Sequence, residues 1–306
     1  MNSERNLNKT SILYHMISEL VVALIILAYV HKKVKFYFVF KKIKKKYNVM
    51  KGAGPVLIKK SKKIGVLFLH GFTSTPQEGE SLGPYLSSKN ISFYAPLLIG
   101  HGTRVEHLAR TTCQDWENSA LKSFDKFSKV VDKVYIVGSS LGGNLAFRIA
   151  TKRKVAGIIS MGTPMFFRRE KIYRGLVYVN LLFRNFIKKA YHEDEKEIVK
   201  NKVQYLYFPL NCMLDVIKMT RLSERALHLI KCPVLIMQSK TDKLLHIDNV
   251  SLIYQKLGSV KKKVYLVPDS YHVFCIDKYK EIAFKEIYKF ISEIEKPLLT
   301  ASTIKA

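Results

Sequence analysis

Short apolar runs alternate with longer amphipathic segments along most of the chain, beginning near residue 56. The short runs are rich in β-branched residues and are bounded by Gly, Pro or Ser, which is typical of buried strands. The longer segments place apolar residues at helical spacing. Strands are expected at residues 64–69, 91–96, 134–137, 155–159, 233–237 and 264–267, and helices at 82–89, 116–131, 141–150 and 279–294. This alternation predicts an α/β fold with a mostly parallel sheet covered by helices on both faces.

The strand–helix rhythm is interrupted between about residues 165 and 230. This stretch is aromatic and basic at first, acidic at Glu193-Asp194-Glu195, and apolar again afterwards. We interpret it as a helical insertion in the α/β domain.

Residues 12–30 are mostly apolar and end in an unbroken apolar run. A helix needs about twenty apolar residues to cross a bilayer, and this segment reaches that length by including His15 and Glu19. A buried core helix is the alternative. No small-residue cleavage site follows, as a signal peptide would require. We therefore expect a transmembrane anchor, with residues 1–46 as the membrane segment and residues 47–306 as the α/β domain.

Eight lysines between Lys32 and Lys46 follow this segment, with an aromatic run at residues 36–40 among them. The other flank carries only Arg5 and Lys9. Because lysines collect on the cytoplasmic side of a membrane helix, this bias predicts a single-pass protein of the cell membrane with its α/β domain in the cytoplasm.

The chain is strongly basic, with a formal net charge of +28. Nucleic acid and an anionic membrane surface are the partners that such a charge favours. No zinc-finger, RRM-like or helix-turn-helix pattern is visible, so no nucleic-acid partner is expected. The four cysteines are far apart and form neither a zinc motif nor a disulfide framework, and neither a metal nor another cofactor is expected. The sequence leaves the oligomeric state open.

The pattern G-x-S-x-G occurs where the strand at 134–137 turns into a helix, at Gly138-Ser139-Ser140-Leu141-Gly142. Such a turn is strained, so the neighbours two before and two after the serine must be small. It lifts the Ser140 hydroxyl out of the sheet at a helix N-terminus, which favours developing negative charge. Ser140 is thus the candidate nucleophile; the alternative is a glycine-rich turn with a capping serine.

A serine nucleophile needs a base, and the base needs a carboxylate that holds its tautomer. Asp242 and His272 follow the strands near 234–238 and 264–267, and such groups lie past the C-terminal ends of strands in open α/β sheets. Asp248 and Asp269 are the fallback acids, and His246 is a weaker candidate base.

Developing oxyanion charge needs backbone N–H donors. Leu141, just after the candidate nucleophile, supplies one, and Phe72 in the loop after the strand at 64–69 supplies the other. Two further histidines, His70 and His101, are expected to shape loops beside the pocket.

A resemblance rests on several motifs together: Leu69-His70-Gly71-Phe72-Thr73-Ser74, Gly100-His101-Gly102, Asp115-Trp116, Gly138 to Gly143, Gln238 to Asp242 and His272-Val273. Over about residues 56–295 the chain resembles the bacterial carboxylesterase and monoacylglycerol-lipase branch of the α/β-hydrolases. The resemblance implies metal-free ester hydrolysis with Ser140 as nucleophile, Asp242 as acid and His272 as base. It also implies a cap, inserted after the sixth strand, over an acyl pocket.

Two features depart from that branch. Tyr271 stands where a small residue usually precedes the histidine, and the N-terminal anchor has no counterpart in the soluble members. We expect a membrane-anchored serine esterase for short or medium acyl esters or monoacylglycerol, acting through an acyl-enzyme. Alternatives are a thioesterase or small peptidase on the same triad, or a non-catalytic protein that binds at the membrane surface.

Overall fold

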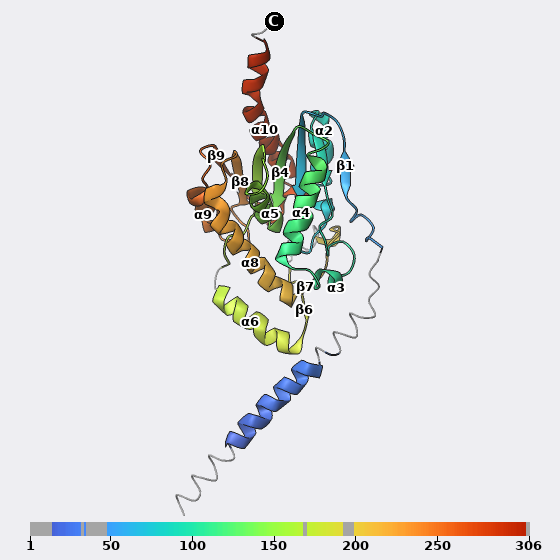
Figure 1. Ribbon diagram of the computed structural model, residues 1–306, viewed down its shortest axis with the longest axis vertical. Coiled ribbons are helices and arrows are strands. Elements are labelled where there is room, and N and C mark those ends of the chain that lie inside the picture. Colours follow the sequence, from blue (N-terminus) through green and yellow to red (C-terminus); the bar gives the residue numbers. More distant parts are fainter. Residues whose placement is uncertain (1–13, 32–33, 35–47, 168–169, 192–198, 304–306) are drawn as a thin grey trace, which may run out of the picture.

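The computed structural model describes residues 14–31, 34, 48–167, 170–191 and 199–303. Most of the lysine-rich segment at 32–46 and the acidic run Glu193-Asp194-Glu195 lie outside the described residues. Figure 1 shows an α/β body with the helix at residues 14–31 at one end and the C-terminal helix extending from the other.

A seven-stranded sheet with the order β1-β3-β2-β4-β5-β8-β9 forms the centre of the described chain. All neighbouring strands are parallel except β1, which pairs antiparallel with β3. The strands are β1 Val56–Ile58, β2 Ile64–Leu69, β3 Ser92–Ala95, β4 Lys133–Ser139, β5 Gly157–Met161, β8 Val234–Ser239 and β9 Lys262–Val267. The predicted mostly parallel sheet is confirmed.

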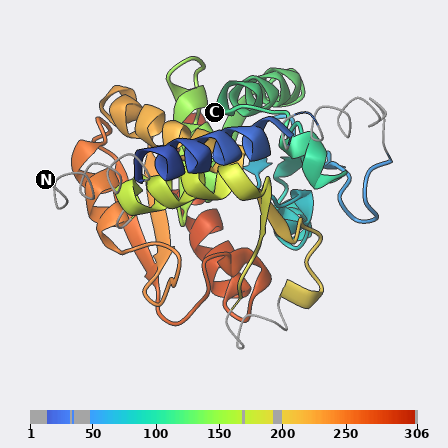
Figure 2. The ribbon, with the colours of Figure 1, turned by 90° about the horizontal axis from the view of Figure 1, so that it is seen from below.

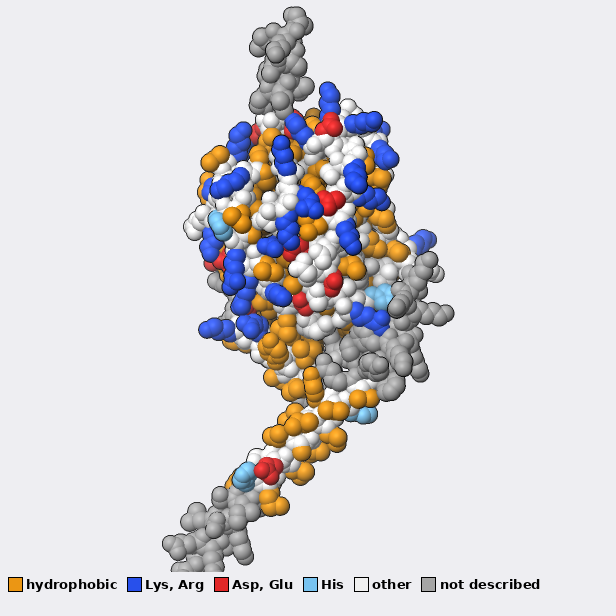
Figure 3. Space-filling model, in the orientation of Figure 1, with side chains coloured by type: hydrophobic (Ala, Val, Ile, Leu, Met, Phe, Trp, Pro, Cys, Tyr) orange, Lys and Arg blue, Asp and Glu red, His pale blue; other side chains and the backbone are white. Residues whose placement is uncertain are grey.

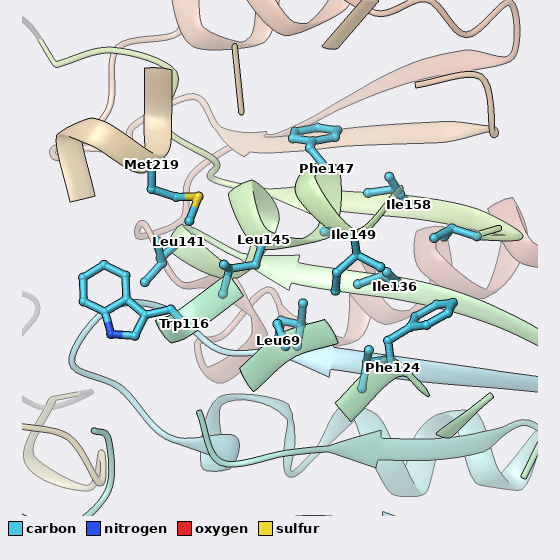
Figure 4. Packing of buried hydrophobic residues seen from close by; sticks show 14 of the residues in the cluster. Leu69, Trp116, Phe124, Ile136, Leu141, Leu145, Phe147, Ile149, Ile158 and Met219 are labelled. Atoms are coloured by element: carbon cyan, nitrogen blue, oxygen red, sulfur yellow. The ribbon is translucent and has the colours of Figure 1, made fainter. Parts of the chain in front are cut away.

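Helices cover both faces of this sheet (Figures 1 and 2). One face carries α4 Cys113–Phe127, α5 Leu141–Ala150, α8 Leu210–Ala226 and α9 Asp248–Lys256, and the other carries α2 Leu82–Ser88 and α10 Lys280–Thr303. Along β2, Leu67 and Leu69 point into the first layer while Val66 and Phe68 point into the second. Figure 4 shows the first layer, where Trp116 and Met219 pack near Leu141 and Leu145.

Helix α4 begins three residues before the predicted start. A reciprocal capping box explains this: the Thr112 side chain accepts from the Asp115 N–H, and the Asp115 carboxylate accepts from the Thr112 N–H. Together they satisfy donors that the helix start leaves open, so the helix extends beyond its apolar pattern. The short helix α3, Val105–Leu108, precedes it.

The cap holds strands as well as helices. Helix α6 Glu170–Phe183 leads to β6 Phe186–Lys188, and β7 Tyr207–Pro209 pairs antiparallel with β6 before α8 returns to the body. The helical insertion expected from the sequence is present, and its described residues also hold a two-stranded sheet that the sequence analysis did not predict. It follows β5, the fifth strand of the described sheet, rather than a sixth.

The N-terminal apolar segment forms a helix at Tyr14–His31. Its mean hydropathy is 1.6, and none of it is buried against the rest of the structure. Within the described residues it is the one helix long and apolar enough to cross a membrane, and its place near the N-terminus also fits a signal sequence. Figure 3 shows hydrophobic side chains along the visible side of this helix, with an acidic and a histidine side chain among them.

Candidate active site

Ser140 occupies a strained turn between β4 and α5. Its backbone φ is 52° and ψ is −116°, outside the usual regions for a residue with a side chain. The Ser140 N–H donates to the Met161 carbonyl at the end of β5 over 2.8 Å, which ties the turn to the next strand. Strain held in this way is characteristic of functional turns.

The glycines on either side of Ser140 have no room for a side chain. A Cβ on Gly138 would lie 2.4 Å from the Gly142 carbonyl oxygen, and one on Gly142 would lie 1.9 Å from the Leu69 carbonyl oxygen. Both contacts are with backbone, which cannot move aside cheaply. The turn therefore needs both glycines of the G-x-S-x-G pattern for the close approach of chain to chain.

Asp242 and His272 are hydrogen-bonded across the ends of β8 and β9. The His272 Nδ1 lies 2.8 Å from the Asp242 Oδ2. The other oxygen, Oδ1, accepts the backbone N–H groups of Leu244 and Leu245 over 2.8 and 2.9 Å. With its carboxylate 1% exposed, Asp242 is held from three directions and orients the imidazole.

The contact between Asp242 and His272 raises the pKa of the histidine and lowers the pKa of the aspartate. Burial alone would lower the pKa of His272, but the charge and hydrogen bond of Asp242 outweigh it and raise that pKa above 6.5. Burial likewise opposes ionisation of Asp242, yet His272 and the two backbone donors hold its pKa below the usual value. Asp242 is therefore ionised at neutral pH. His272, with its raised pKa, can gain or lose a proton near neutral pH.

The His272 ring packs beside Gly162 at the end of β5. A Cβ on Gly162, the residue after the Met161 that binds Ser140, would lie 3.2 Å from the His272 ring, so this ring packs on the end of β5. The His272 Nε2 is buried and has no hydrogen-bond partner among the described residues. An imidazole held by one nitrogen with the other unpaired is arranged to accept a proton from a nearby group.

Phe72 and Leu141 present the two predicted backbone donors. Leu141 is the first residue of α5, whose N-terminus begins at the Ser140 turn, and Phe72 follows Gly71 in the loop after β2. A Cβ on Gly71 would lie 3.5 Å from the Ser140 Cβ, which places this loop against the turn. Neither N–H donates to a described residue, so both are available to an oxyanion.

The loop after β2 is fixed by an ion pair that the sequence analysis missed. The Gly71 N–H donates to the Glu78 Oε2 over 2.9 Å, and the Glu78 Oε1 lies 2.7 Å from the Lys202 Nζ in the cap. Although burial opposes it, this pairing lowers the pKa of Glu78 to about 2. Because the two partners are 124 positions apart in the sequence, no local pattern could signal this ion pair.

A second contact joins the same loop to the cap. The Phe72 ring stacks on Phe208 of β7 with ring centroids 6.0 Å apart and planes 6° apart, and it also contacts Trp116 of α4 at 5.5 Å. Tyr205 reinforces the junction, since its N–H donates to the Thr73 carbonyl over 2.9 Å. The cap therefore contacts the loop that carries the candidate oxyanion donor.

His70 and His101 support loops, as the sequence indicated. His70 is buried; its Nε2 accepts the Leu98 N–H over 3.2 Å and its Nδ1 lies 3.0 Å from the Gly71 carbonyl, an arrangement that fits the neutral ring. Burial lowers the pKa of both histidines, that of His101 to about 3. The two rings meet edge to face at 5.0 Å.

The fallback residues have other partners. Asp248, at the first turn of α9, lies 2.7 Å from the His246 Nδ1, and Asp269 lies 3.1 Å from the Lys278 Nζ on the surface. Neither carboxylate reaches His272. Among the described residues, no group of three or more His, Cys, Asp or Glu side chains is placed to hold a metal ion.

Comparison with known proteins identifies the family of this chain. Residues 60–279, most of the chain, match the family described as "Serine aminopeptidase, S33". The chain belongs to the S33 serine aminopeptidase family. This family assignment places it among the α/β-hydrolases and confirms the recognition made from the motifs.

Two curated relatives of this S33 chain are bacterial esterases or lipases. A carboxylesterase of Bacillus subtilis (strain 168) is 24% identical over 232 residues, which cover 75% of this chain and 93% of the relative. A thermostable monoacylglycerol lipase of Bacillus sp. (strain H-257) is 26% identical over 248 residues, 81% of this chain and 97% of the relative. The chain thus falls in the carboxylesterase and monoacylglycerol-lipase branch, and the predicted class of a lipase-like hydrolase is confirmed.

Solved structures agree on the fold. One from a study of LipS and LipT, two metagenome-derived lipolytic enzymes, superposes with a TM-score of 0.74 at 26% identity, covering 80% of this chain and 100% of that one. A monoacylglycerol lipase of Paleococcus ferrophilus gives a TM-score of 0.66 at 16% identity, covering 78% and 98%. The S33 chain therefore has the α/β-hydrolase fold.

Proposed function

We propose that the protein is a serine esterase that cleaves carboxylic esters, with short or medium acyl esters and monoacylglycerols as its substrate class. The observation that carries the proposal is the buried Asp242–His272 pair, whose His272 Nε2 has no partner among the described residues, in a chain whose Ser140 stands in a strained turn. The carboxylesterase and monoacylglycerol-lipase names of the relatives support the ester substrate.

The proposed mechanism assigns one role to each group. His272 takes the Ser140 proton as the Oγ attacks the ester carbonyl, and Asp242 stabilises the imidazolium that results. The N–H groups of Phe72 and Leu141 bind the oxyanion of the tetrahedral intermediate. His272 then protonates the leaving alcohol, and water, activated by the same histidine, hydrolyses the acyl-enzyme.

A peptidase on the same triad is the second candidate, because the matched family is described as a serine aminopeptidase. The triad itself does not choose the leaving group. Matched p-nitrophenyl esters, monoacylglycerols and aminoacyl p-nitroanilides of equal acyl size, assayed on the full chain in detergent, separate the two. The esterase proposal expects kcat/KM for the esters to exceed that for the anilides by orders of magnitude; a preference for the anilides would overturn it.

We further propose that the helix at Tyr14–His31 anchors the protein in the cell membrane with the α/β body in the cytoplasm. The anchor is supported by the hydropathy of this helix, and the orientation by the eight lysines between Lys32 and Lys46. Helix α6 lies at the same end of the molecule (Figure 1) and exposes an apolar face at Ile172, Leu176 and Val179. This face would lie against the bilayer and bring the cap close to lipid-derived esters.

Fractionation and protease protection test the anchor. The full chain should stay with membranes through a high-salt wash, and its α/β body should resist protease added outside intact cells. Release by salt would reduce the attachment to a peripheral one, and digestion from outside would reverse the orientation. Secretion of a chain shortened at its N-terminus would instead identify the helix as a signal sequence.

A further inference from the structure

His272 lies in a short loop that a buried carboxylate closes. The Oδ2 of Asp277 accepts the Tyr271 N–H over 3.2 Å, and the same oxygen accepts the Ser270 hydroxyl. The other oxygen, Oδ1, accepts the Tyr279 N–H over 2.7 Å. Asp277 therefore ties the two residues that precede His272 to the segment that follows it.

The loop that carries Asp242 holds Ser270 from the other side. The Ser239 hydroxyl donates to the Ser270 carbonyl over 2.6 Å, and the Thr241 hydroxyl donates to the same oxygen over 2.9 Å. In return, the Ser270 N–H donates to the Ser239 Oγ over 3.2 Å. Ser239 is the last residue of β8, so these bonds join the chain just before Asp242 to the chain just before His272.

Ser270 is thus bound through its hydroxyl, its carbonyl and its N–H. Ser239 and Ser270 are both buried, and a buried polar group that loses its partner cannot readily replace it with water. We refer to the three side chains that hold this residue, those of Ser239, Thr241 and Asp277, as the Ser270 clamp. The clamp fixes the backbone two positions before His272 against the loop of Asp242.

We propose that the Ser270 clamp is a positioning device for the proposed catalytic base, because it sets the contact between His272 and Asp242. The inference rests on the proposed esterase function, in which His272 takes the Ser140 proton. The clamp acts on His272 through the backbone of the loop. A catalytic group displaced by about 1 Å can lower a rate by about a hundredfold, so even a small relaxation of the loop would slow the reaction.

The titration of His272 reports on the contact that the clamp sets. Burial lowers the pKa of His272, and the charge and hydrogen bond of Asp242 raise it by more; the charges of Lys202 and Glu78 act in opposite directions. A longer contact with Asp242 would leave burial less opposed, so the pKa would fall. Asp277 carries a further charge in the same loop. The test therefore uses substitutions that leave all of these charges in place.

Ser239→Ala and a matched control, Ser92→Ala, are the main test. Ser92 is also 1% exposed, like Ser239, and its Oγ donates to the Ser61 carbonyl over 2.7 Å and accepts the Lys60 N–H over 2.8 Å. It is the first residue of β3, whereas Ser239 is the last residue of β8. The two variants thus lose similar buried hydrogen bonds at opposite ends of strands, and both should lower the melting temperature.

Only Ser239→Ala should alter the chemistry. In the full chain in detergent it should lower kcat and kcat/KM for p-nitrophenyl butyrate together, by about tenfold or more, and move the acid-side midpoint of kcat/KM to lower pH. Ser92→Ala should change neither. Equal kinetic effects in the two variants, or a loss of kcat in Ser239→Ala without a shift of the midpoint, would overturn the proposal.

Three milder variants test the other members of the clamp. Thr241→Val removes the hydroxyl at an exposed position and keeps the shape, whereas Thr241→Ser keeps the hydroxyl. Thr241→Val should lower kcat roughly threefold, as the loss of one neutral hydrogen bond allows, and Thr241→Ser should retain it. Ser270→Ala, which removes the hydroxyl bound to Asp277, should also lower kcat. Equal rates for the two Thr241 variants, or an unchanged rate for Ser270→Ala, would overturn the role of that member.

Histidine NMR separates this inference from the proposed function, because it needs no turnover. The full chain carries isotope-labelled histidine, and the His272 signal is assigned by its absence in His272→Asn. Ser239→Ala should lower the titration midpoint of His272, and Ser92→Ala should not. A lowered midpoint in a chain that hydrolyses no ester would overturn the esterase function and leave the clamp. Ester hydrolysis beside an unmoved His272 midpoint would overturn only the clamp.

Discussion

Phe72, in the loop that carries one candidate oxyanion donor, stacks face to face on Phe208 of the cap, with 6° between the ring planes. The cap thus contacts the loop whose Phe72 N–H is the proposed oxyanion donor. The Glu78–Lys202 ion pair joins the same two parts of the chain. Changes in the cap should therefore alter catalysis through the position of this loop.

Phe208→Ala should lower kcat for esters by roughly tenfold, since a misplaced oxyanion donor costs transition-state stabilisation of one to several kcal/mol. Loss of a half-buried aromatic contact should also cost about 1–2 kcal/mol of folding stability. Steady-state kinetics and thermal unfolding measure the two effects. Tyr207→Ala, at the exposed neighbour on β7, is the control; an equal loss of kcat there would show that the effect is not specific to the Phe72 contact.

Gly142→Ala should destabilise the fold severely or prevent folding, because the new Cβ would lie 1.9 Å from the Leu69 carbonyl oxygen. Gly175→Ala is the matched control: a Cβ there would meet nothing within 4 Å, and the residue lies inside helix α6. This control should gain about 0.5–1 kcal/mol. Thermal unfolding checks both, and a well-folded Gly142→Ala chain would contradict the described turn.

Asp242→Asn should reduce kcat by about ten-thousandfold, because the amide no longer holds the required tautomer of His272. Asp248→Asn should cost little, since Asp248 pairs with His246 and not with His272. Ester hydrolysis by the two variants, with circular dichroism to verify folding, makes the comparison. A larger loss at position 248 would move the acid there.

Activity should fall on the acid side with a midpoint above pH 6.5. His272 must be neutral to accept the Ser140 proton, and Asp242 raises the pKa of His272 above its ordinary value of 6.5. The fraction of competent enzyme therefore decreases as the pH falls through that raised pKa. The pH profile of kcat/KM for p-nitrophenyl butyrate measures it, and a midpoint below 6.5 would mean that the Asp242–His272 contact does not operate in solution.

Much of the fold could be predicted from the local pattern of apolar and polar residues. The apolar strand runs and the G-x-S-x-G motif predict β2, β4 and the start of α5. These segments are buried, and the pattern that marks each of them lies within the segment itself. Ser140, Asp242 and His272, the triad predicted from their order along the chain, follow β4, β8 and β9; β8 and β9 are neighbours in the sheet, and β5 lies between β4 and β8.

The contacts missed were those made between distant parts of the chain. Nothing near Glu78 or Lys202 in the sequence indicates that they pair, and β6 and β7 are three residues each, too short for a strand pattern. The sequence analysis did not predict helix α9, although an acidic residue such as Asp248 suits the first turn of a helix.

The measurement that tests the central claim most directly is labelling of the full chain by a fluorophosphonate probe, which reacts only with an activated serine. Intact-mass and peptide mass spectrometry should show one adduct, on Ser140, with labelling lost in Ser140→Ala and strongly slowed in His272→Ala. Kinetics of the same variants should show a loss of kcat on the order of a millionfold for Ser140→Ala. No adduct on the folded protein, or an adduct on another serine that persists in Ser140→Ala, would contradict the account.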